Sequence, residues 1–170
     1  MIWDAAIWKE ELQKELNDFY KFSVATAISE DEYINLRVEK FFFVCAFIAR
    51  KLSEANKLSD ELISKDFSCI KYQRIKDDNI IDFLNWHHFE RFYNLEEGEK
   101  SLLKLKELCN ILIHSLIFCI TTDNNNKLCG VFINSDWKKD KCYYIELNTF
   151  IELINDIIND VVSKHYSRYH

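Results

Sequence analysis

Hydrophobic residues recur along this chain with two different spacings, and the spacing changes near residue 115. Before that point, most apolar positions repeat every three or four residues, which is the period of an amphipathic helix. After it, short β-rich runs alternate with polar turns, which is typical of strands. The pattern predicts helices over 3–20, 29–56, 59–64, 80–93, 97–115 and 149–162, and strands over 67–75, 116–122, 128–133 and 142–147.

Two of these helices begin with the sequence of a capping box, in which a hydroxyl group and a later glutamate satisfy free backbone amides. The pairs are Ser29 with Glu32 and Thr149 with Glu152. Residues 41–48 are apolar on every side, so we expect other elements to surround this part of the second helix.

Together the elements predict one domain over residues 1–170, of the α+β class and mainly α. A chain of 170 residues is long enough to bury a substantial core. We expect a helical bundle followed by a small C-terminal antiparallel meander of three strands and a final helix. The strands should be antiparallel neighbours because only short polar loops connect them.

Composition narrows the function classes. The chain has a formal net charge of −6 and a pI of about 5.4, which argues against broad binding of a phosphate backbone and favours a basic partner. No apolar run approaches the roughly 20 residues that span a bilayer, so no membrane association is expected.

The six cysteines lie mostly in apolar runs without metal-site spacing, and the N-terminus does not resemble a signal peptide. We therefore expect reduced, mostly buried thiols and a cytoplasmic protein.

The most informative polar residues are Asn110 and His114, which lie four apart on the predicted helix 97–115 and so share a face. A histidine in this setting could act as a general acid or base, with Asn110 orienting it. Alternatively, both side chains tie the helix to a neighbouring loop by hydrogen bonds. We expect the second role, with His114 packed on the stripe of Leu105, Leu108 and Leu112 and bonded to a backbone carbonyl.

Residues 108–115 (LCNILIHS) resemble the signature helix of the HEPN superfamily, which has an arginine, a polar residue, three further residues and a histidine. Asn110 and His114 match the polar residue and the histidine, and Cys109 stands where the family has its arginine. The resemblance implies a helical bundle and a dimer. In part of the family it also implies a metal-independent ribonuclease of toxin–antitoxin or phage-defence systems. Cysteine cannot stabilise a pentavalent phosphate as a guanidinium can, so the missing arginine argues against cleavage.

Two further segments carry candidate binding residues. If residues 80–93 form a helix that packs near His114, His87 and Arg91 share a face and could supply the missing positive charge, but we favour an aromatic core helix with a polar edge. Trp137, Lys138 and Lys139 could contact phosphate or an acidic partner, or simply form a solvated hairpin loop. Residues 50–60, 85–87, 108–118 and 135–136 also resemble a set of small uncharacterised bacterial proteins, which implies no function.

These observations favour a HEPN-like interaction or regulatory protein of a bacterial defence or toxin-linked system, of the immunity or antitoxin type. It would act through a protein partner or a homodimer, with no cofactor and no metal. The alternative is a metal-independent ribonuclease that uses Asn110, His114 and Arg91 on RNA. Geometry separates the two hypotheses, because a catalytic His114 must be exposed in a cleft near a cation, whereas a structural one is buried.

Overall fold

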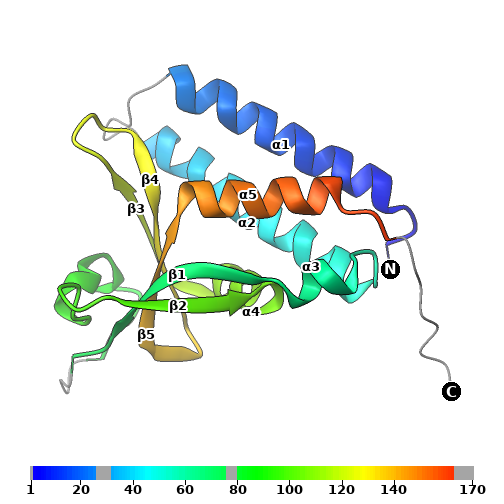
Figure 1. Ribbon diagram of the computed structural model, residues 1–170. Coiled ribbons are helices and arrows are strands. Elements are labelled where there is room, and N and C mark those ends of the chain that lie inside the picture. The colour runs from blue at the N-terminus through cyan, green and yellow to red at the C-terminus, as the bar shows by residue number, and fades with distance from the viewer. Residues whose placement is uncertain (1, 26–31, 76–79, 163–170) are drawn as a thin grey trace, which may run out of the picture.

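The computed structural model describes residues 2–25, 32–75 and 80–162 of the chain, which form helices and one sheet (Figure 1). The helices are α1 (Ala5–Ala25), α2 (Glu32–Glu54), α3 (Asp60–Ser64), α4 (Leu105–Ile113) and α5 (Leu147–Asn159), with a 3₁₀ helix η1 (Trp86–Arg91). The strands are β1 (Asp66–Gln73), β2 (Glu99–Lys104), β3 (Ser115–Thr122), β4 (Leu128–Ser135) and β5 (Lys138–Glu146).

The sheet has five strands in the order β2-β1-β5-β4-β3, and all neighbours are antiparallel. The prediction of a helical bundle with a three-strand meander is therefore wrong, and the domain is α+β with a larger sheet. β3, β4 and β5 lie where strands were predicted, but β5 pairs with β1 on its other edge, as in Ile70 opposite Tyr144. β1 in turn pairs with β2.

The extra strand β2 comes from a segment that was predicted to be helical. Leu102, Leu105 and Leu108 have helical spacing, but residues 99–104 are extended and pair with β1, from Asp66 opposite Lys104 to Lys71 opposite Glu99. The helix begins only at Leu105. A helical period in a short stretch can thus be overridden by strand pairing, since both conformations satisfy the backbone.

Two other predicted helices also change. Residues 80–93 form no α-helix: only η1 is helical there, and His88 breaks it with non-helical backbone angles. The final helix begins at Leu147, so the pair Thr149 and Glu152 does not cap its start. The capping box at Ser29 lies outside the described residues.

The main core lies between one face of the sheet and the helices α2, α4 and α5, with α1 packed outside on α2 and α5 (Figure 1). Its centre is aromatic: the ring of Phe42 stacks on Phe150 at 4.3 Å between centroids, and Phe41 meets both edge-on. Of residues 41–48, which were predicted to be surrounded, five are buried, Phe43 and Val44 are partly buried, and the side chain of Phe47 is exposed.

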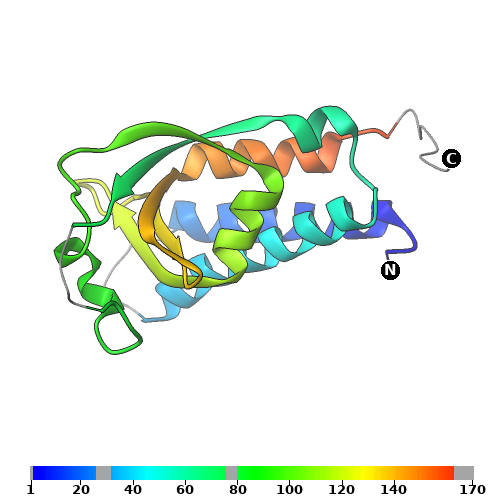
Figure 2. The ribbon, with the colours of Figure 1, turned by 90° about the horizontal axis from the view of Figure 1, so that it is seen from below.

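A second, smaller core covers the opposite face of the sheet. The segment that contains η1 packs Ile81, Phe92 and Tyr93 against Ile117 and Cys142 of the strands. In Figure 2 this segment lies at the end of the molecule away from the N-terminus.

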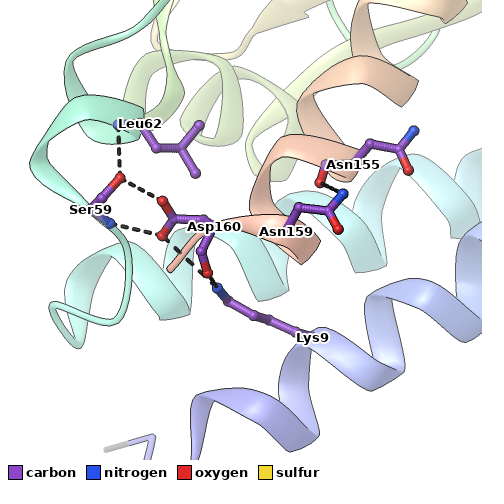
Figure 3. A network of polar contacts seen from close by, with 6 residues as sticks. All are labelled: Lys9, Ser59, Leu62, Asn155, Asn159 and Asp160. Carbon is purple, nitrogen blue, oxygen red and sulfur yellow. Dashed lines mark hydrogen bonds and ion pairs between the residues drawn. The ribbon is translucent and has the colours of Figure 1, made fainter. Parts of the chain in front are cut away.

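A polar network joins the C-terminal end of α5 to α1 and α3 (Figure 3). The carboxylate of Asp160 accepts hydrogen bonds from the Ser59 hydroxyl at 2.5 Å and from its backbone N–H at 2.9 Å. The Ser59 hydroxyl also caps α3 by accepting from the N–H of Leu62 at 3.2 Å. Lys9 donates to the backbone carbonyl of Asp160 and lies 3.9 Å from its carboxylate. Asp160, the residue that follows α5, therefore holds α1, α3 and α5 together.

In the described parts of the chain, no helix is both long and apolar enough to cross a membrane. All six cysteines are free thiols, and Cys45, Cys69, Cys109 and Cys142 are buried.

Candidate functional site

The polar face of α4 forms one wall of a cleft of about 350 Å³. Glu107, Asn110 and His114 line it, and their spacing of three and four residues places them in one row along the helix. The apolar stripe of α4, formed by Leu105, Leu108, Cys109 and Leu112, is buried on the other side of the helix.

His114 is exposed, so the prediction that it is buried in the packing stripe is wrong. It lies nine residues after Leu105, and at about 100° per residue this places it about half a turn away from that stripe. His114 ends the helix, where its backbone N–H donates to the carbonyl of Asn110 at 3.1 Å. Its side chain therefore faces the cleft at the end of α4.

The other walls of the cleft come from distant parts of the chain. Arg50 is contributed by α2, Leu103 by β2 and Tyr143 by β5. Ser135 ends β4, Lys138 begins β5, and Trp137 lies in the tight turn between these strands. The indole of Trp137 is 80% exposed and stands at the rim.

The β4–β5 turn is fastened to the end of α4. The backbone N–H of Asp136 donates to the carbonyl of His114 at 3.0 Å, and the N–H of Trp137 donates to the Ser135 hydroxyl at 3.2 Å. The turn thereby holds Trp137 and Lys138 next to His114.

Positive charge gathers in the cleft although the whole chain is acidic. Arg50 and Lys138 are cations, whereas Glu107 is the single carboxylate in the lining. Lys138 has no ion pair among the described residues, but Arg50 bonds the carboxylate of Glu54 at 2.8 Å. Glu107 accepts from the backbone N–H of Lys104 at 3.1 Å at the start of α4.

Burial shifts the pKa of two groups near the cleft, one on the buried side of α4 and one in the cleft lining. Burial raises the pKa of the Cys109 thiol to about 12, and the nearby guanidinium of Arg50 opposes this rise only partly. Burial likewise raises the pKa of the Tyr143 hydroxyl. Cys109 is thus a neutral buried thiol. The Oδ1 atom of Asn110 is buried without a hydrogen-bond partner in the described residues.

Three of the sequence-predicted site residues do not reach this cleft. Lys139 points away from it, and its ammonium donates to the carbonyl of Ile81 at 3.0 Å. His87 and Arg91 are exposed on η1, which packs beside β3 as part of the second core, and neither lines the cleft. They do not share a face as they would in an α-helix, because η1 is a 3₁₀ helix interrupted at His88.

The cleft brings together Asn110, His114, Trp137 and Lys138, all of which the sequence pointed to, and adds residues that were not predicted as site residues, among them Glu107, Arg50 and Tyr143. Glu107 could have been found, since it stands three residues before Asn110 and seven before His114 on one helix face. Arg50 and Tyr143 carry no local signal, because only the packing of α2 and β5 against α4 brings them to the site.

The arrangement suits recognition of an anionic group beside an aromatic ring. Amide, hydroxyl, guanidinium and ammonium groups supply hydrogen-bond donors, and Trp137 offers a flat apolar surface. In the part of the chain that the structure describes, no cluster of three or more His, Cys, Asp or Glu residues is placed to hold a metal ion. Comparisons with protein-family models, curated proteins and solved structures find no match to this chain.

Proposed function

We propose that this protein acts by binding, and that the cleft beside α4 receives an anionic group of a macromolecular partner. The observation that carries this proposal is the meeting of Arg50, His114 and Lys138, from three separate elements, in one cleft of an otherwise acidic protein. Charge-assisted hydrogen bonds from such groups are about twice as strong as neutral ones, so they would dominate recognition.

The side chains of the cleft favour binding over turnover. A histidine that serves as a general acid or base is normally oriented by a third group, and the imidazole of His114 has no hydrogen bond among the described residues. Arg50 is engaged with Glu54, and Glu107 is engaged in capping α4. A ligand could recruit these groups, but no proton-transfer pair is formed in advance.

We propose the same biological role that the sequence suggested. It would be an interaction or regulatory protein of a bacterial defence or toxin-linked system, of the immunity or antitoxin type, with a protein as its partner. The resemblance to the HEPN superfamily is kept for α4 alone, because the fold is not the helical bundle that the resemblance implies. Free, largely buried thiols agree with a cytoplasmic location.

The test compares partners retained by cleft variants in co-purification from the native host. Arg50→Gln with Lys138→Gln removes both permanent cations and keeps much of their length. Lys127→Gln is the matched control, because Lys127 is exposed in the β3–β4 loop away from the cleft residues. We expect a stable partner to be kept by the wild type and the control and lost by the double variant. A partner retained by all three proteins would contradict the proposal.

A second candidate function is metal-independent RNA cleavage by His114. The observation that favours it is the exposure of His114 in a cleft with Arg50, which is the geometry that a catalytic histidine requires. The assay incubates a labelled RNA oligonucleotide with the wild type, with His114→Ala and with His88→Ala, a histidine outside the cleft. Cleavage that persists in EDTA and is lost only in His114→Ala would support this function, and no cleavage by the wild type would reject it.

A further inference from the structure

Arg50 lines the α4 cleft with one side of its guanidinium already bound. Its Nε atom donates to the Glu54 carboxylate at 2.8 Å, one turn further along α2, and Lys51 bonds the other oxygen of that carboxylate at 3.0 Å. These two bonds hold the pKa of Glu54 below its usual value. The two terminal Nη atoms of Arg50 make no hydrogen bond or ion pair within the described residues. Arg50 can therefore offer both of them to one planar anion.

The charge of the cleft lining matches a group with a single negative charge. With histidine counted as neutral, the cations Arg50 and Lys138 and the carboxylate of Glu107 leave one net positive charge. A carboxylate would neutralise this charge. A phosphate monoester carries a charge of about −1.5 to −2 at neutral pH, so it would bring excess negative charge next to Glu107. The lining therefore favours a carboxylate over a phosphate monoester.

The cleft is larger and more apolar than a carboxylate alone requires. Its volume of about 350 Å³ lies in the range of about 300–1,000 Å³ that is typical of pockets for small molecules. Leu103 and Ile111 line it with aliphatic side chains, and the exposed indole of Trp137 stands at its rim. Aromatic side chains of this kind commonly anchor a partner at an interface. We therefore expect an apolar side chain to accompany the anion.

Asn110 adds a neutral hydrogen-bond donor to the cleft. Its Oδ1 atom is buried, whereas its Nδ2 atom, which has no partner among the described residues, is not. Because Asn110 lines the cleft, Nδ2 can donate to the carbonyl oxygen of an occupant. The cleft thus combines donors for an anion, an apolar wall and a donor for a neutral carbonyl.

We propose that the α4 cleft binds the C-terminal residue of a protein partner, with its main-chain carboxylate between Arg50 and Lys138 and its side chain against Trp137. This inference rests on the proposed function and specifies the anionic group. A chain end supplies a carboxylate, a side chain and the preceding peptide carbonyl together, which are the three groups that the cleft can bind. An internal aspartate or glutamate uses its side chain as the carboxylate, so the same residue has no side chain left for the apolar wall.

RNA is a poorer occupant than a protein chain end. Its phosphodiesters are also single negative charges, but they follow one another along the strand. A chain with a net charge of −6 repels such a polyanion outside the cleft, whereas a chain end brings one charge that the cleft encloses.

The test measures peptide binding from the indole N–H signal of Trp137 in ¹H–¹⁵N NMR spectra, assigned by its loss in Trp137→Phe. The probes are acetylated peptides of sequence Gly-Ser-Gly-X, in which X is alanine, leucine or phenylalanine. Each is made with a free C-terminal carboxylate and as the C-terminal amide. We expect the leucine or phenylalanine acid to bind, and its amide to bind about ten- to a hundredfold more weakly because the charge-assisted bonds are lost.

Several results would overturn the proposal. Equal binding of the acid and the amide would do so, as would no binding of any free acid. Tighter binding of an amidated peptide with an internal aspartate or phosphoserine, or of a short oligouridine, would also overturn it. These comparisons use the wild-type protein, so no folding defect of a variant can produce them.

Protein variants test the charges of the lining. Arg50→Gln and Lys138→Gln should each weaken the binding of the free acids about tenfold and leave the amides unchanged, whereas Lys127→Gln, outside the cleft, should change neither. Glu107→Gln keeps an acceptor for the N–H of Lys104 and raises the net charge of the lining. It should therefore improve the binding of the phosphoserine peptide about tenfold.

Failure of this inference can be distinguished from failure of the proposed function. A native partner that is lost by the double variant of Arg50 and Lys138, while the wild type binds acids and amides equally, would overturn only the assignment of a chain end. Conversely, removing the last residue of a co-purified partner should abolish its binding if the inference is correct.

Discussion

Asp160 connects three elements, so its removal should destabilise the domain far more than removal of an ordinary surface carboxylate (Figure 3). The side chains of Lys9 and Asp160 are only 13% and 9% exposed. Asp160→Ala takes away the acceptor of the Ser59 hydroxyl and of its N–H, at 2.5 and 2.9 Å. Lys9 keeps the backbone carbonyl of residue 160 but loses the nearby negative charge.

The magnitude follows from these contacts. A hydrogen bond to a charged group contributes about 1.5–3 kcal/mol, and two are lost. Because Ser59 is only half-buried, water can replace part of this loss, so we expect the free energy of unfolding to fall by about 3 kcal/mol. Asp160→Asn, which can still bond Ser59 but carries no charge, should lose about 1 kcal/mol. Both variants would also destabilise the charged ammonium of Lys9. Burial already lowers the pKa of Lys9, and both variants remove the Asp160 carboxylate that opposes this effect.

The assay is urea denaturation at neutral pH, with the slope checked for two-state behaviour. In a chain of this size the melting temperature of Asp160→Ala should fall by about 6–12 °C. Asp156→Ala is the matched control, since it lies on α5 four residues before Asp160 and pairs with Lys65 at 2.6 Å in a half-exposed position. Exposed pairs of this kind contribute about 0–1 kcal/mol. Equal stability losses in Asp160→Ala and Asp156→Ala would refute the reasoning.

Four further results are expected. Gly130→Ala should lose roughly 1–3 kcal/mol in urea denaturation, because the added Cβ would lie 2.3 Å from the rigid carbonyl oxygen of Ile145; a wild-type midpoint would contradict this. Tyr93→Phe should lose about 1–3 kcal/mol, because the buried Asn134 loses the acceptor that its Nδ2 reaches at 2.8 Å; calorimetry measures it. Asn110→Leu should leave the melting temperature unchanged or higher, because it replaces a buried oxygen that has no partner in the described residues; a clear fall would show that the oxygen is bonded. A thiol reagent on the folded protein should label Cys129 first, because burial raises the pKa of Cys69 to about 11 and that of Cys119 to about 12, and the four buried cysteines should react only after denaturation.

The local pattern of hydrophobic and polar residues was enough to predict much of the secondary structure. The spacing of apolar residues located α1, α2 and α3, and the β-rich runs located β1, β3, β4 and β5 within a few residues. These elements were predictable because one face of each must be buried. Hydrophobic residues therefore recur about every 3.6 positions in a helix and about every 2 positions in a strand. The same helical geometry also determined the face of His114, although the residue was first assigned to the wrong side of α4.

Tertiary structure alone decided the size of the sheet and the walls of the cleft. Residues 99–104 have helical spacing, and they are extended only because β1 offers them a strand to pair with. β1 itself joins the sheet because β5, far along the chain, has a free edge. Arg50 and Tyr143 reach the α4 cleft for the same reason, since their positions depend on packing between distant elements. Such long-range contacts leave no periodic trace in the sequence, because they depend on which surfaces meet and not on the spacing within either segment.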